Sequence, residues 1–306
     1  MKINISILTI LVVLFLAQSS YAQPDPPQRP LAGTFRNTIL INSASTTIVP
    51  RKSFEFHIRH RFGLIEPDRT VITNFLGMDG TSNIQFSFAF PLGNKTMIGV
   101  GRTRNDKTYN LNFKRVLLSQ TEDNKIPFTV ALYTNFDIKT NSFAKISSNA
   151  YFSDGVTPFK NKFNHRISYF TQLIFSKKIQ NLISLQLSPA FIYQNLAEYN
   201  QDNYSYALPV SCAVKTGFYS SIIIEYAYLV NYTTENNLHP LSIAMEFGTA
   251  GHVFQVIATT SQALTEPELY TSTPTAYTKG NFLLGFNLRR TFRLKNKKNI
   301  EHTRIK

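Results

Sequence analysis

The sequence predicts an all-β fold, a transmembrane antiparallel β-barrel of about 12 strands, with roughly 10 to 14 as the range. The first observation is an alternation of apolar and polar residues, which gives a strand one apolar and one polar face. In residues 281–292, one face carries the apolar side chains of Phe282, Leu284, Phe286, Leu288 and Phe292. The other face carries Leu283, Gly285, Asn287, Arg289 and Thr291. The second observation concerns the lengths of the connections between such runs.

Short and long connections alternate along the chain, as in bacterial outer-membrane barrels, whose periplasmic turns are short and outer loops long. With a periplasmic N-terminus, the inner turns 91–95, 178–181, 216–219 and 248–251 are short, and the outer loops 63–82, 139–165 and 261–280 are long. Connection 105–107 is outer by parity yet tight. A soluble β-sandwich has no reason to alternate in this way, so the pattern favours a barrel whose apolar face meets lipid.

Four parts follow along the chain. Residues 1–22 have the pattern of a signal peptide, with Lys2, an apolar run and small residues before a cut ahead of Gln23. Residues 23–52 form a proline-rich periplasmic leader, in which 34–41 is either a short strand or a plug-like segment. Residues 53–293 form the barrel, and 294–306 a basic C-terminal tail. After residue 22, no apolar run is long enough for a transmembrane helix.

Within the barrel, each expected strand is a run of alternating, β-branched or aromatic residues between turn-forming ones. Pro189 and Pro209 fall inside two runs, and each is expected to mark a bulge or a strand end because proline donates no N–H. Arg290 interrupts the last apolar face and is expected near a membrane rim, since a lipid-facing charge costs about 2–4 kcal/mol at mid-membrane. The runs are residues 53–62, 83–90, 96–104, 108–118, 128–138, 166–177, 182–194, 204–215, 220–230, 240–247, 252–259 and 281–292.

The formal net charge of +14 does not indicate a nucleic-acid partner, because the chain is expected to be exported and its basic residues are spread out before the tail. The expected partners are outer-membrane lipids and a small solute, with the tail attracted to an anionic lipid or envelope polymer. The one cysteine, Cys212, excludes an internal disulfide and is expected to be buried or lipid-facing. The 25 Phe and 15 Tyr supply residues for interfacial aromatic girdles.

The candidate site is a set of charged residues on the lumenal, polar face of the strands. Its two arginines are expected to form ion pairs with its two later glutamates across the lumen. These pairs either satisfy a closed, side-chain-filled interior or form a ring that steers small anions through a narrow pore. The histidine is expected to pair with the first glutamate or with a neighbouring strand. The set is Glu55, His57, Arg59, Arg61, Glu225 and Glu246.

No catalytic residue, metal site or cofactor is expected. His57 and His60 are three residues apart in a strand, so their side chains point to opposite faces and cannot share a metal ion. Serines and histidines are present, but no short motif joins them into the triad that a membrane-embedded esterase needs. We therefore expect no enzymatic activity, and a lipid-modifying enzyme is the third functional alternative.

Several short motifs occur in a fixed order: HRFG at 60–63, GVGRTRNDK at 99–107, SYF at 168–170, GHVFQ at 251–255, and YTKGNF at 277–282 with GFN at 285–287. In this order they resemble the predicted outer-membrane β-barrel proteins of unknown function from Bacteroidota. The resemblance runs from about residue 35 to 293 and leaves out the tail. It implies a barrel in the outer membrane and no particular activity.

We therefore expect a monomeric barrel in a bacterial outer membrane, with both termini in the periplasm. The first functional hypothesis is passage or binding of a small solute, with the lumenal charges as selectivity elements. The alternative is a closed structural or interaction barrel that presents the loops 139–165 and 261–280 outward.

Overall fold

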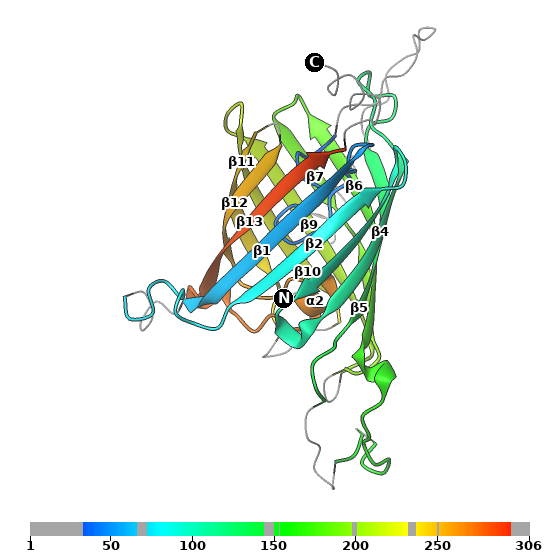
Figure 1. The fold of residues 1–306 in the computed structure, drawn as a ribbon, viewed down its shortest axis with the longest axis vertical. Helices are drawn as coiled ribbons and strands as arrows, with labels where there is room; N and C mark the ends of the chain where they lie inside the picture. The colour runs from blue at the N-terminus through cyan, green and yellow to red at the C-terminus, as the bar shows by residue number, and fades with distance from the viewer. Residues whose placement is uncertain are drawn as a thin grey trace, which may run out of the picture.

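A single antiparallel sheet that closes on itself dominates the computed structural model, which describes residues 33–65, 72–143, 150–152, 154–197, 201–231, 237–249 and 251–294. The first strand, β1 (Ser53–Ile65), pairs along its length with the last, β13 (Phe282–Arg293), so the sheet has no free edge (Figure 1). The predicted all-β class and the closed barrel of 12 strand positions are confirmed.

Each strand position pairs with its neighbours along the chain. The strand bounds differ from the predicted runs by only a few residues. Between β1 and β13 lie β2 (Asn83–Pro91), β3 (Thr96–Thr103), β4 (Tyr109–Leu118), β5 (Thr129–Ile138), β6 (Ile167–Ile179), β7 (Ile183–Leu187), β8 (Ala190–Gln194), β9 (Tyr204–Lys215), β10 (Ser220–Leu229), β11 (Leu241–Gly248) and β12 (His252–Thr259). The short helices are η1 (Asn105–Lys107), η2 (Phe163–Arg166), α2 (Glu266–Thr271) and η3 (Tyr277–Lys279).

The strands β7 and β8 are successive halves of one wall position, because both pair with β6 and with β9. The break falls at Ser188 and Pro189, which confirms the expectation for Pro189. The expectation for Pro209 is wrong, because β9 continues through it. Pro209 accepts a bond from the Ser188 N–H at 2.9 Å but has no N–H to return. The missing N–H of Pro209 therefore coincides with a break in the neighbouring wall position, between β7 and β8, and not in β9 itself.

Apolar side chains cover the outer face of the barrel and polar ones the inner face. In β2, Phe86 is 47% exposed and Phe88 is also exposed, whereas Gln85 and Ser87 between them are buried. Outward rings of adjacent strands contact one another, with centroids 5.0 Å apart for the tilted pair Phe56 and Phe88. This orientation is the one expected of a membrane barrel and the reverse of that in a soluble barrel.

No helix in the described ranges has the length and apolar character needed to cross a membrane.

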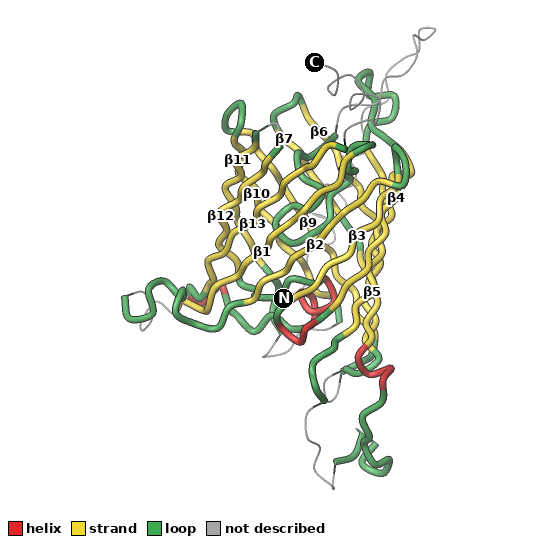
Figure 2. The backbone as a smooth tube through the Cα atoms, in the orientation of Figure 1, coloured by secondary structure: helices red, strands yellow, loops and turns green. Residues whose placement is uncertain are grey.

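The connections sort to opposite ends of the barrel (Figures 1 and 2). The short turns 92–95, 180–182 and 216–219 and the described residues between β11 and β12 lie at one end, termed the short-turn end. The described parts of the loops that follow β1, β5 and β12 lie at the other end, termed the long-loop end. The tight exception at 105–107 forms η1, where Asp106 has a φ of 51°. Arg290 lies outward opposite His252, the first residue of β12, with its guanidinium 4.7 Å from the Phe292 ring. It is therefore near a rim, as expected.

Two segments that are not part of the wall fill the lumen. Residues 34–49, termed the plug, enter from the short-turn end and are mostly buried. Of the two alternatives for residues 34–41, the plug-like one is correct, since only an isolated bridge, Ile39 to Ala44, forms there. Residues 261–275, termed the lumen loop, fold in from the long-loop end and carry α2 (Figure 2). Residues 34–49, predicted as part of a periplasmic leader, thus lie inside the barrel.

The predicted signal peptide, residues 1–22, and the start of the leader lie outside the described residues. All of the predicted tail except Leu294 lies outside them as well.

Candidate functional site

Two charged wall residues on different strands, Glu225 and Arg61, bind the same tripeptide of the plug, residues 41–43. The carboxylate of Glu225 on β10 accepts the backbone N–H groups of Ile41 at 3.0 Å, Asn42 at 2.8 Å and Ser43 at 3.4 Å. The guanidinium of Arg61 on β1 donates to the Ile41 carbonyl at 3.2 Å and to Asn42 Oδ1 at 2.9 Å. The acid therefore binds the donors of this tripeptide and the base binds its acceptors.

The expected ion pairs between the arginines and the later glutamates are not formed. Arg59 instead donates to the Gln85 side chain and to the carbonyl of Leu264 in the lumen loop. Glu246 accepts from Gln255 Nε2 on the adjacent strand at 2.9 Å. Within the described ranges, neither arginine contacts a carboxylate at ion-pair distance. The plug and the lumen loop lie between the walls and take up these hydrogen-bonding groups.

Glu55 links the wall to the plug at the short-turn end. It forms an ion pair with Arg289 on β13 at 2.8 Å and accepts the hydroxyl of Thr38 in the plug at 2.8 Å. His57 Nε2 lies 3.2 Å from the same carboxylate, which confirms the expected pairing of His57 with Glu55. All six predicted candidates thus face the lumen, and five of them, all except Glu246, form hydrogen bonds with the plug or the lumen loop.

Lys114 on β4 is a plug contact that the candidate set lacked, although it shares the inward parity of that strand. Its side chain is buried, and its ammonium donates to the carbonyls of Thr38 at 2.8 Å and Thr47 at 3.1 Å. No carboxylate in the described ranges lies within ion-pair distance of it. The charge is therefore held by the plug's own carbonyl dipoles.

The lumen loop binds the wall through both polar and apolar contacts. Glu266 accepts the Tyr133 hydroxyl at 2.8 Å and the Asn135 amide at 2.9 Å. Tyr270 stacks on the inward-facing Phe170 with ring centroids 5.7 Å apart, and its hydroxyl reaches Ser43 of the plug at 3.5 Å. The two inserted segments therefore meet inside the barrel.

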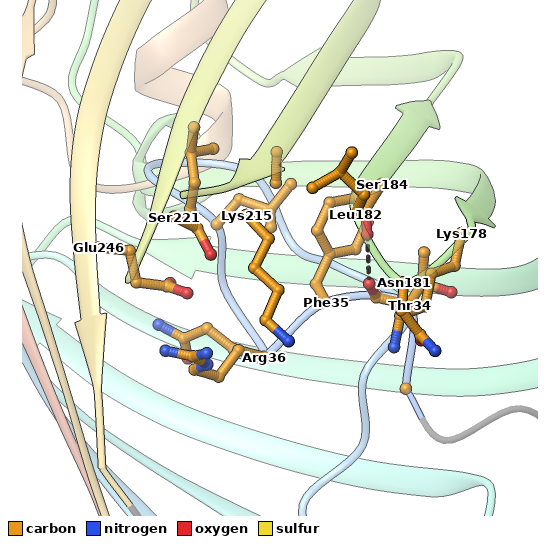
Figure 3. Close-up of a pocket in the computed structure, with 15 residues that line it drawn as sticks. Thr34, Phe35, Arg36, Lys178, Asn181, Leu182, Ser184, Lys215, Ser221 and Glu246 are labelled. Carbon is orange, nitrogen blue, oxygen red and sulfur yellow. Dashed lines mark hydrogen bonds between the residues drawn. The ribbon is translucent and has the colours of Figure 1, made fainter. Parts of the chain in front are cut away.

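The cavities at the two ends of the barrel are lined by side chains of mainly opposite charge. At the short-turn end, a cavity of about 360 Å³ lies between the plug and the wall, and its charged lining is Arg36, Lys178, Lys215 and Glu246 (Figure 3). A second cavity there, of about 720 Å³, shares Arg36. At the long-loop end, a cavity of about 200 Å³ has Asp106, Asp137, Glu268 and Lys139 as its charged lining. The lumen is thus basic at one mouth and acidic at the other.

Among the residues that the structure describes, no three His, Cys, Asp or Glu side chains gather closely enough to hold a metal ion.

A closed sheet with an apolar outer face and a charged inner face defines a membrane-spanning β-barrel. The chain matches the family described as membrane bound beta barrel domain (DUF5777) over residues 35–292. Because the match covers most of the chain, the chain belongs to this family. The resemblance seen in the sequence is confirmed to that extent.

Among solved structures, the chain is similar to the KdgM porin, with a TM-score of 0.45 and 8% identity over 78% of this chain and 99% of that one. It is also similar to an outer membrane channel from Pseudomonas putida F1, with a TM-score of 0.45 and 10% identity over 88% and 100%. A third similar structure is the outer membrane phospholipase A from Escherichia coli, with a TM-score of 0.39 and 10% identity over 80% of this chain and 91% of that one. No curated protein sequence matches the chain.

Proposed function

We propose that this protein is a gated channel of a bacterial outer membrane, in which a small solute passes through the lumen once the plug is displaced. The supporting observation is the way in which the plug is held. Charged and polar wall groups bind its main chain through hydrogen bonds, as Glu225, Arg61 and Lys114 do at residues 38–47. When the plug leaves, water can replace it as the hydrogen-bonding partner of these wall groups.

The chemistry of the wall supports a removable plug over a permanent filling. Burying charges is costly, and well-packed apolar residues of similar volume often hold a closed interior at least as well. A charged wall becomes favourable when the lumen fills with water, as in porins. The lumenal charges of this barrel, Glu55, Arg59, Arg61, Lys114 and Glu225, would then be hydrated and would act on passing ions.

The proposed location and orientation in the membrane are those predicted from the sequence. The short-turn end faces the periplasm, both termini lie there, and a cleaved signal peptide exports the chain. Outer-membrane lipids surround the barrel, and the basic tail contacts an anionic lipid or envelope polymer. A source among the Bacteroidota and the absence of enzymatic activity stay predictions, the latter checked by incubation with labelled phospholipid or lipopolysaccharide.

Planar-bilayer recordings on three proteins test the proposal. These are the chain from Gln23 on, the same chain without residues 34–49, and one that also lacks residues 263–273 of the lumen loop. We expect rare openings, frequent openings and a larger steady conductance, in that order. Gel migration of the folded form before and after heating controls for barrel formation. Folded barrels that stay silent after both deletions would refute the channel.

The second candidate function is the closed structural or interaction barrel. The observation that favours it is the filling of the lumen from both ends, with the plug and lumen loop in contact at Ser43 and Tyr270. It predicts that no condition increases the conductance of the full chain, even when the plug-deleted barrel conducts. Recordings of the full chain under voltage and with periplasmic solutes therefore separate the two candidates.

A further inference from the structure

The cavity at the short-turn end between plug and wall brings together basic residues from three different parts of the chain. Arg36 comes from the plug, Lys178 from the end of β6 and Lys215 from the end of β9. Figure 3 shows Arg36 and Lys215 directed into the same space, with Lys178 at its far side. Glu246 is the one acidic side chain of its lining, so cations exceed anions there by three to one.

Within the described ranges, none of these three cations has a carboxylate at ion-pair distance. Arg36 donates to the backbone carbonyls of Tyr219 at 2.6 Å and Phe218 at 3.2 Å, which fixes its guanidinium at the cavity but leaves its charge in place. Glu246 is bonded to Gln255 in the wall. The site therefore presents a fixed guanidinium and two lysine ammoniums to anything that enters.

The size and position of the cavity limit what it accepts. Its volume of about 360 Å³ lies at the lower end of the range for small-molecule sites. The adjoining cavity adds Arg51, Lys52 and Arg293, so the field at this mouth attracts anions from solution. The opposite mouth, with Asp106, Asp137 and Glu268, does not share this property.

We propose that this cavity binds a small polyvalent anion, one that carries phosphate or several carboxylate groups, and that the bound anion holds the plug closed. The inference deepens the proposed function and rests on it for the second part. A ligand that contacts Arg36 on the plug and the lysines on the wall binds the plugged state more tightly than the open one. By linkage, it shifts the population toward the plugged state in proportion to its occupancy.

Calorimetric titration of inorganic tripolyphosphate into the full chain tests the site, with the protein in nanodiscs of uncharged phosphatidylcholine. We expect Lys215→Gln to weaken binding about tenfold, because the variant loses one charge-assisted hydrogen bond to the anion. Lys178→Gln combined with Lys215→Gln should reduce it below detection. Glu246→Gln should strengthen it. Lys95→Gln is the matched control, because Lys95 is exposed in the β2–β3 turn at the same end and lines neither cavity.

Three results would overturn the proposed site. One is an absence of binding to the unaltered chain, and another is an equal loss in Lys95→Gln, which would indicate general surface charge. The third is loss of binding in nanodiscs that contain phosphatidylglycerol, which would assign the cavity to lipid headgroups. The channel proposal is judged separately by the conductance of the plug-deleted barrel. In recordings of the full chain, tripolyphosphate should lower the opening frequency, and the double lysine variant should lose this effect.

Discussion

Glu225→Gln should loosen the plug strongly, because this carboxylate alone accepts three consecutive N–H groups of residues 41–43. Glutamine keeps one acceptor oxygen, loses the charge, and turns an NH₂ donor toward N–H groups that it cannot bind. Weakening two bonds to a charged acceptor and leaving one buried N–H without a partner costs about 2–4 kcal/mol. That free energy corresponds to an open-to-plugged ratio roughly 30- to 900-fold higher.

The modification rate of a cysteine in the plug measures this ratio. Ala44 is 1% exposed, so Ala44→Cys in a Cys212→Ala background should react with a membrane-impermeant maleimide only when the plug leaves. Rates are compared at pH 8.5 with and without Glu225→Gln. In buffer without polyvalent anions, Glu246→Gln is the matched control, because this buried glutamate is bonded to the wall residue Gln255. Equal rates for the two glutamine variants would refute the assigned role of Glu225.

Three further predictions concern other contacts. Lys114→Met removes two donors to plug carbonyls, and hydrogen exchange in residues 38–47 should speed up by an amount equivalent to about 2 kcal/mol; an unchanged rate would count against the assigned contact. Gly285→Ala should hinder closure of the barrel, since its Cβ would lie 2.4 Å from the His60 carbonyl oxygen, and heat-dependent gel migration would reveal less folded protein. Burial raises the pKa of Glu268 above 4.5, so the docked lumen loop is most stable at acidic pH and weakens as pH rises through that raised value. Exchange in residues 263–273, corrected for intrinsic rates, should reveal this trend, and Glu268→Gln should reduce it.

The sequence predicts the wall of the barrel well because each strand carries its own signal. Alternation depends only on which residues meet lipid and which meet the lumen, and that condition holds at every position of a strand such as β2. The inward orientation of Glu55, His57, Arg59 and Arg61 follows from the same parity. The groups that these four side chains contact cannot be predicted in this way, because alternation does not indicate what fills the lumen.

The plug has no periodic signal of its own. Residues 34–49 mix Thr, Asn and Ser with Ile and Leu in no fixed order, and their conformation depends on wall groups far away in sequence, such as Glu225. A weaker sequence signal of a filled lumen is present in β6, where the apolar residues Phe170 and Ile174 occupy inward positions that are expected to be polar. Both are buried against apolar residues that include Tyr270 of the lumen loop. Such breaks in parity mark where a lumen is filled.

Pairing of the plug with the wall by a disulfide tests the central claim most directly. The hydroxyl oxygens of Thr46 and Ser176 lie 2.7 Å apart, close to the positions that two bonded sulfur atoms would occupy. In a Cys212→Ala background, Thr46→Cys with Ser176→Cys should oxidise to an intramolecular disulfide in the folded barrel, detected by mass spectrometry, and should block openings until a reductant is added. Two free thiols in a folded, oxidised barrel would contradict the claim that residues 34–49 close its lumen.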